Sequence, residues 1–180
     1  MTGVQTCALP IWRIAELVDG VIRLQDPASD THNTIFANLV REISIHVRAH
    51  QPQCRAVATP GIRPKLRKKQ NWRVPEIAVT CAPNRKDVHA TEGATLIVEV
   101  LSRHNRRDTW GNVPLYASVP TVQEMLLVDS EKVEVHLLRR QPDGNWPDDP
   151  TVLGPGAIIE LTSIGMSLPL AVAYEGTWLA

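Results

Sequence analysis

The chain contains few cysteines, few aromatic residues and no excess of charge of either sign. Its 180 residues include three cysteines, 4% aromatic residues, and 19 basic residues balanced by 19 acidic ones. Cys7, Cys54 and Cys81 form no Cys-x-x-Cys motif and have no neighbouring His pair, which argues against a zinc site and against a disulfide framework. We therefore expect reduced, inert thiols and a cytoplasmic protein. Because the net charge is zero, any case for nucleic-acid binding must rest on local patches.

Long apolar runs and several well-known catalytic motifs are also absent. No stretch reaches the roughly 18 apolar residues that a membrane span needs, and the start of the chain lacks the pattern of a signal peptide. A serine-hydrolase elbow, a phosphate-binding P-loop and a dinucleotide glycine fingerprint are missing too. The remaining composition, 43% hydrophobic and 21% charged, is typical of a globular domain without a membrane partner.

Residues 1–11 read MTGVQTCALPI, which resembles the translation of a sequencing-adapter oligonucleotide. We expect this segment to be non-native and exclude it from the fold, as one excludes a tag. The alternative is a genuine, flexible N-terminus. Residues 12–180 then form a single domain, which is the domain count that this length favours.

From Trp12 onward, the pattern is one of short strands and one strong helix. Two runs, 13–18 and 21–24, flank Asp19-Gly20, a dipeptide that favours a tight hairpin turn. A helix is predicted over 32–49, capped by Asp30 or Thr31, because apolar residues recur there at three- and four-residue spacings. Further strands are predicted over 55–59, 62–66, 76–81, 94–101, 122–128, 132–138 and 157–161, with a weak helix over 106–118. The pattern predicts one α/β (α+β) domain.

Two glutamates carry the chemistry that the pattern suggests. Glu99 interrupts the otherwise apolar strand ATLIVEVL, where an ionised carboxylate is costly unless it is paired, hydrogen-bonded or bound to a metal. Glu76 opens the strand EIAVTC directly after Pro75. Two carboxylates on adjacent strands can share one divalent cation. The alternatives for Glu99 are a position on an edge strand or a salt bridge to Arg103 or Arg106, and the alternative for Glu76 is a solvated side chain.

One concentrated basic segment stands out in the neutral chain. It contains Arg63, Lys65, Arg67, Lys68, Lys69, Trp72 and Arg73, without any acidic residue. Such a segment can follow a phosphate backbone while its tryptophan stacks on a base, although a solvated hairpin loop would look the same. Three further side chains, Glu16, His32 and Tyr116, are candidates to line a cleft together with Glu76 and Glu99.

Taken in order, several motifs resemble the Uma-two family of restriction endonucleases, within the PD-(D/E)xK nuclease superfamily. The matching segments are ELVDG (16–20), VPEIAVTC (74–81), LIVEVLS (96–102), RRDTWGNVPLY (106–116), VPTVQEMLLVD (119–129), RRQPDGNW (139–146) and SIGMSLPLAVAYEG (163–176). The resemblance implies a restriction-endonuclease-like fold, with a mixed sheet flanked by helices, an N-terminal hairpin and a long first helix. It also implies Mg²⁺ or Mn²⁺ held by Glu76, at the family's Asp position, and by Glu99.

The chain departs from the family pattern at three positions. Glu76 is one methylene longer than Asp, Leu101 stands where the superfamily motif has Lys, and Asn112 stands where the family supplies a Lys from the following helix. Arg106, Arg107 or His104 could replace the missing positive charge.

The leading reading of these motifs is a metal-dependent DNA endonuclease. Glu76 and Glu99 would hold the ion, and Asn112 or Arg107 would orient water or phosphate. The alternatives are an inactive DNA-binding or interaction module that keeps the nuclease fold, and a nuclease or regulator of a non-DNA partner. The sequence leaves homodimerisation open.

Overall fold

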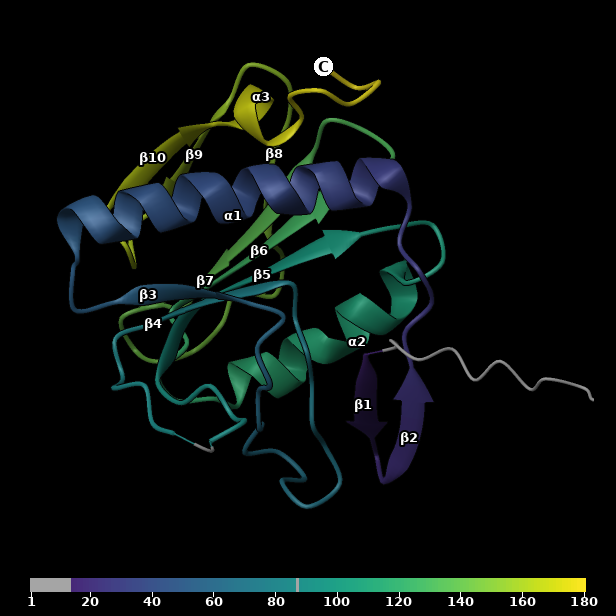
Figure 1. Cartoon of the computed structure of the whole chain (residues 1–180), viewed down its shortest axis with the longest axis vertical. Helices are drawn as coiled ribbons and strands as arrows, with labels where there is room; N and C mark the ends of the chain where they lie inside the picture. Colours follow the sequence, from purple (N-terminus) through teal and green to yellow (C-terminus); the bar gives the residue numbers. More distant parts are fainter. Residues whose placement is uncertain (1–13, 87) are drawn as a thin grey trace, which may run out of the picture.

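A six-stranded mixed sheet forms the centre of the computed structural model, which describes residues 14–86 and 88–180 (Figure 1). The strands are β3 (Arg55–Ala58), β4 (Ile77–Thr80), β5 (Ala94–Leu101), β6 (Glu124–Asp129), β7 (Val135–Arg139) and β8 (Thr151–Leu153), in this spatial order. Only β5 and β6 run parallel. The predicted mixed sheet is confirmed, whereas residues 1–11 with Cys7 lie outside the described residues.

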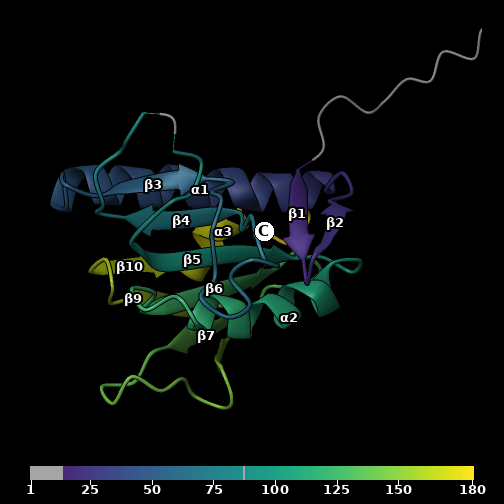
Figure 2. The same ribbon diagram turned by 90° about the horizontal axis from the view of Figure 1, so that it is seen from below.

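Helices cover both faces of this sheet (Figure 2). The long helix α1 (Asp30–His50) lies on one face and α2 (Arg106–Ala117) on the other. A second hairpin, β9 (Ile158–Leu161) with β10 (Met166–Pro169), and the short helix α3 (Leu170–Ala173) join the α1 side of the core. The two faces therefore enclose two separate apolar clusters, one on the α1 side and one on the α2 side. No helix in the described ranges is long and apolar enough to cross a membrane.

Helix α1 is the predicted long first helix, with a different cap. Ile35, Leu39 and Ile43 are completely buried against the sheet, as their three- and four-residue spacing predicts. The cap is Ser29, whose side chain accepts the backbone N–H of His32 at 3.2 Å. Asp30 lies in the first turn instead, where a negative charge favours the helix dipole. The prediction of Asp30 or Thr31 as the cap was therefore wrong by one or two residues.

The N-terminal hairpin is confirmed and is attached to the segment that contains the basic residues. Strands β1 (Ala15–Val18) and β2 (Val21–Leu24) pair in antiparallel fashion. Asp19 (φ 49°) and Gly20 (φ 86°) both adopt the left-handed conformation that such a tight turn requires. On its other edge, Leu17 exchanges two backbone hydrogen bonds with Trp72, at 3.0 and 2.9 Å. The hairpin and residues 62–73 therefore form one structural unit.

The strand predicted over 62–66 does not form. Ile62 pairs only with Arg73, in an isolated bridge. Pro64 has no N–H to donate to a ladder, and Arg67 has a φ of 48° that ends any extended run. The segment is an anchored loop instead of a strand.

Cys54 and Cys81 form a disulfide, which corrects the prediction of reduced thiols for this pair. Strand β3 pairs with β4 so that Arg55 lies opposite Thr80. Cys54, one residue before β3, therefore lies opposite Cys81, one residue after β4. Their separation of 27 residues explains why no local spacing pattern indicated the bond.

Candidate active site

A cavity of about 1190 Å³ opens beside the end of β5. It lies where the β1–β2 hairpin, the start of α1 and the start of α2 meet, as the arrangement of these elements in Figure 1 shows. Its wall includes Glu16, His32, Glu76, Glu99 and Asn112. Residues from five separate parts of the sequence therefore share one cavity.

Glu76 and Glu99 lie opposite one another on neighbouring strands. The β4–β5 register pairs Ile77 with Val98, so Glu76, one residue before β4, lies across from Glu99. Side chains alternate along a strand, and Ile97 belongs to the apolar cluster on the α2 side. Glu99 therefore points to the α2 side as well, and both Glu76 and Glu99 line the cavity.

Glu99 is almost completely buried and receives one strong hydrogen bond. It is 8% exposed, and the Tyr116 hydroxyl donates to its Oε1 at 2.7 Å. Burial raises the pKa of the Glu99 carboxyl well above its usual range, and the charge of Glu76 raises it further, while the Tyr116 hydrogen bond opposes both effects. Burial and the charge of Glu99 also raise the pKa of Tyr116, so the phenol remains a donor. A cation between the two carboxylates would relieve their repulsion.

Glu76 is held from the other side of the sheet by His32. The Nε2 atom of His32 lies 3.0 Å from Glu76 Oε1 and 3.1 Å from the carbonyl oxygen of Val100. Both neighbours are acceptors, so Nε2 must carry the proton. Each carboxylate thus has one oxygen engaged by a donor from a helix, His32 from α1 or Tyr116 from α2.

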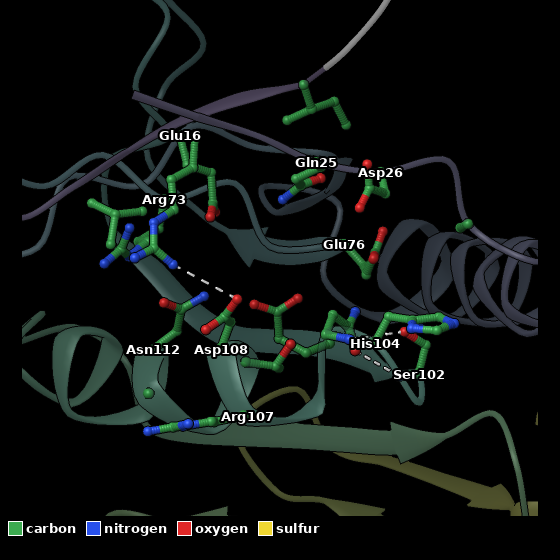
Figure 3. Close-up of a pocket in the computed structure, with 18 of the residues that line it drawn as sticks. Glu16, Gln25, Asp26, Arg73, Glu76, Ser102, His104, Arg107, Asp108 and Asn112 are labelled. Atoms are coloured by element: carbon green, nitrogen blue, oxygen red, sulfur yellow. Dashed lines mark hydrogen bonds and ion pairs between the residues drawn. The ribbon is translucent and has the colours of Figure 1, made fainter. Parts of the chain in front are cut away.

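Glu16 brings a third carboxylate to the cavity wall (Figure 3). Its Oε1 accepts the backbone N–H of Val74 at 2.7 Å. Burial raises the pKa of Glu16, and the charges of Asp108 and Glu76 add to the effect, whereas the Val74 hydrogen bond and the charge of Arg73 oppose it. The wall is therefore rich in carboxylates whose charge the protein only partly compensates.

The donor set fits a magnesium-type ion through two carboxylates. Within residues 14–86 and 88–180, no group of three or more His, Cys, Asp or Glu side chains is arranged to hold a metal. Mg²⁺, however, binds through one or two carboxylates and completes its shell with water and substrate phosphates. The opposed Glu76 and Glu99 satisfy that requirement. Burial is the main cause of the raised pKa of Glu99, and the charge of Glu76 adds a repulsion that such an ion would offset.

The residues proposed to orient water or phosphate lie on α2. Asn112 and Arg107 both line the cavity. Figure 3 shows Asn112 beneath Arg73, whereas the Arg107 side chain points away from Glu76. Sequence reasoning had not singled out Asp108, which lies 3.8 Å from Arg23 of the hairpin, because an ion pair between distant elements leaves no local signal.

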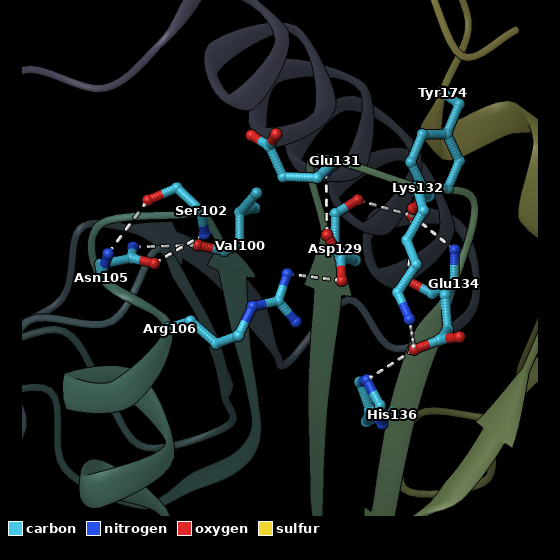
Figure 4. A network of polar contacts seen from close by, with 10 residues as sticks. All are labelled: Val100, Ser102, Asn105, Arg106, Asp129, Glu131, Lys132, Glu134, His136 and Tyr174. Atoms are coloured by element: carbon cyan, nitrogen blue, oxygen red, sulfur yellow. Dashed lines mark hydrogen bonds and ion pairs between the residues drawn. The ribbon is translucent and has the colours of Figure 1, made fainter.

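Arg106 is not available to replace the missing lysine. Its guanidinium lies 2.7 Å from the Asp129 carboxylate, which is fully buried at the end of β6 (Figure 4). This pair also removes Arg106 as a salt-bridge partner of Glu99. Arg103 and His104 are exposed at the cavity rim.

The basic segment divides into an exposed part and a buried part. The exposed cations are Arg63, Lys65, Arg67, Lys68 and Lys69. Their loop is anchored to α2, because the Ser118 hydroxyl accepts the backbone N–H groups of residues 65 and 66, each at 3.0 Å. Trp72 is half-buried, with the Arg63 guanidinium 5.6 Å above its ring. Arg73 is buried, so the segment is not one uniform solvated loop.

Comparison with solved structures finds a protein of similar fold. A solved structure from Anabaena variabilis, described as "a putative nuclease belonging to DUF820", matches with a TM-score of 0.70 at 18% identity and covers 89% of each chain. That likeness shows a shared fold.

The sequence comparisons identify the family. The model of the Uma2 family, described as "Putative restriction endonuclease", matches residues 8–173. An uncharacterized protein of Synechocystis sp., slr1290, is 32% identical over 165 residues, which cover 89% of this chain and 83% of that relative. The chain belongs to the Uma2 family, and the resemblance seen in its motifs is confirmed.

Proposed function

We propose that this chain is a metal-dependent endonuclease that hydrolyses phosphodiester bonds in DNA. Membership of a family described as a restriction endonuclease and the nuclease-like fold support the hydrolase class. The observation that supports metal dependence is the placement of Glu76 and Glu99, which lie opposite one another on neighbouring strands and line one cavity. Glu76 and Glu99 would hold one Mg²⁺ or Mn²⁺ ion.

The side chains around the ion have separate tasks in this proposal. A bound divalent ion makes hydroxide available from water and stabilises charge on a phosphate. His32 and Tyr116 each hold one carboxylate oxygen in place. Asn112 orients water or phosphate through its amide, with Arg107 at the rim. The exposed lysines of the basic segment attract the DNA backbone.

The test measures Mn²⁺ binding to the parent and to Glu99→Gln by isothermal titration calorimetry. The amide keeps the shape of the side chain and removes its charge, so Glu99→Gln should lose the metal. Mn²⁺ at a hundredfold excess over its dissociation constant should stabilise only the parent, by about 2.7 kcal/mol. Glu160→Gln is the matched control, since Glu160 is an exposed acid on β9 that does not line the cavity. Identical isotherms for the parent and Glu99→Gln would end the proposal.

Cleavage is measured on the same proteins with supercoiled and single-stranded DNA. Activity should require Mg²⁺ or Mn²⁺ and should disappear in Glu99→Gln. The two substrates also report whether the site accepts a paired or an unpaired strand.

A second candidate function is an inactive DNA-binding module. Asn112 favours it, because a neutral amide cannot supply the positive charge of the family's lysine. DNA binding without metal dependence and without cleavage would select this second candidate.

Two further expectations belong to the proposal, namely a cytoplasmic location and homodimer formation. The Cys54–Cys81 bond bears on the first, because cytosolic thiols are normally kept reduced. Alkylation of free thiols at the moment of cell lysis would show the state of the pair. Light scattering on the purified protein measures the second.

A further inference from the structure

Arg73 is a buried arginine in the wall of the cavity without an acidic partner. It is 3% exposed and lines the same cavity as Glu76 and Glu99. One terminal nitrogen donates to the carbonyl oxygen of Leu17 and the other to Asn71 Oδ1, each at 3.0 Å. Its Nε is buried and has no hydrogen-bond partner. None of the ion pairs found among the described residues includes Arg73.

The nearby acid does not neutralise this charge. Glu16 is close enough for Arg73 to influence it electrostatically, but its Oε1 accepts the Val74 N–H at 2.7 Å, and no contact within 4.0 Å joins the two charged groups. Burying a guanidinium without a counter-ion costs several kcal/mol. Two neutral acceptors orient Arg73 but leave that cost largely in place, which is the condition of a side chain prepared to receive an anion.

The geometry also fits the kind of anion. A guanidinium has five N–H donors in a planar fork that matches phosphate oxygens, and Leu17 and Asn71 occupy only part of that fork. Arg73 precedes Glu76 by three residues and, in Figure 3, lies on the hairpin side of the cavity above Asn112. The side chain that would face a phosphate held at the carboxylates is therefore Arg73, rather than Arg106, which Asp129 already holds.

We propose that Arg73 is a phosphate-binding residue of this site, which contacts a non-bridging oxygen of a nucleic-acid phosphate beside Glu76 and Glu99. It supplies the positive charge that Leu101 and Asn112 do not. A role of Arg73 in DNA cleavage rests on the proposed function, whereas the binding of a single phosphate group by Arg73 does not require cleavage. Its role differs from that of the exposed lysines, since it contacts one phosphate inside the cavity and not the backbone outside.

The test measures binding of thymidine 5′-monophosphate by calorimetry, with Mn²⁺ binding as a second readout. Arg73→Gln should weaken nucleotide binding at least about tenfold, the value of a lost charge-assisted hydrogen bond. Arg73→Lys keeps the charge but loses the fork, so its affinity should be intermediate. Arg48→Gln is the control, because Arg48 is exposed in the last turn of α1, about 24 Å along the helix from His32.

A merely structural role for Arg73 makes a different prediction, because loss of folding would remove Mn²⁺ binding together with nucleotide binding. Weaker nucleotide binding with unchanged Mn²⁺ binding supports the proposal. If Arg73→Gln does not fold, the same two measurements on Arg73→Lys decide. Parent-like nucleotide affinity in the folded variant, or no nucleotide binding by the parent, overturns the proposal. A parent that binds the nucleotide but cuts no DNA would contradict the proposed function and leave this phosphate site standing.

Discussion

Two hydrogen-bond donors, one from each flanking helix, hold the carboxylates of the site in position. Tyr116 holds one oxygen of Glu99, and His32 holds one oxygen of Glu76. Both come from helices, on opposite faces of the sheet, so the position of the carboxylates depends on the packing of α1 and α2.

Tyr116→Phe removes the donor to Glu99 and little else. We expect Mn²⁺ affinity to fall by at least about tenfold, because a hydrogen bond to a charged group contributes roughly 1.5–3 kcal/mol. Calorimetry with Mn²⁺ measures the change. Tyr174→Phe is the matched control, since the Tyr174 hydroxyl donates at 2.8 Å to the carbonyl of Asp129, away from the cavity. That variant should lose stability and keep its Mn²⁺ affinity; an equal loss of affinity in both variants would argue against a positioning role.

At the scale of elements, the basic loop and the hairpin act as one unit. Asp19 in the hairpin turn accepts from Arg67 at 3.0 Å, and Gly20 donates its N–H to the carbonyl of Gln70 at 2.8 Å. The loop is therefore held at the mouth of the cavity while its lysines stay exposed.

Replacing Lys65, Lys68 and Lys69 by Gln should weaken DNA binding and flatten its dependence on salt. The plot of log affinity against log salt should lose up to roughly 0.9 in slope for each phosphate contact removed. Fluorescence anisotropy with labelled DNA at several salt concentrations measures this slope. An unchanged slope, with Arg48→Gln as the reference for loss of a remote charge, would assign the lysines to a solvated loop.

Strand β6 is joined to the β9–β10 turn by one buried carboxylate. Glu124 accepts from Arg139 Nε at 2.6 Å and from the backbone N–H groups of Thr162 and Ser163, at 3.1 and 2.8 Å. Burial alone would raise the pKa of Glu124, but the hydrogen bonds from Ser163, Arg139 and Thr162 outweigh it and hold the pKa below its usual value of 4.5.

The lowered pKa of Glu124 makes its contribution to stability depend on pH. The unfolded chain takes up this proton first as the pH falls, so the contribution is fully present above about pH 4.5 and is lost as the pH drops through the lower pKa of the folded protein. Glu124→Gln should be less stable than the parent by about 2 kcal/mol at neutral pH. This difference should shrink in urea denaturation below pH 4.5, and a difference that is constant with pH would contradict the assignment.

At the scale of the whole molecule, the disulfide closes a loop of 27 residues that contains the entire basic segment. Such a closure is worth about 3.5 kcal/mol in the chain-entropy model. Dithiothreitol should therefore lower the free energy of unfolding of the parent by up to this amount, and Cys54→Ser should remove the response. Denaturation that is insensitive to reductant in the parent would contradict a bond in solution.

The sequence by itself determined the elements whose causes are local. The left-handed turn at Asp19-Gly20, the apolar spacing of α1 and the continuous apolar run of β5 depend only on neighbouring residues. Glu99 could be found because a charge inside such a run is costly wherever the strand lies. The motif order was also sufficient to identify the family.

Only the tertiary structure decided which distant side chains meet. The pairing of Cys54 with Cys81, the capture of Arg106 by Asp129, and the burial of Arg73 without an acid all follow from strand order and register. The sequence named His32 and Tyr116 as cleft candidates, but the carboxylate that each one contacts belongs to the same group, because helices on opposite faces bring them to the cavity. Such contacts join residues far apart along the chain, and their energies appear only after the sheet has assembled. Local spacing therefore carries no signal for them.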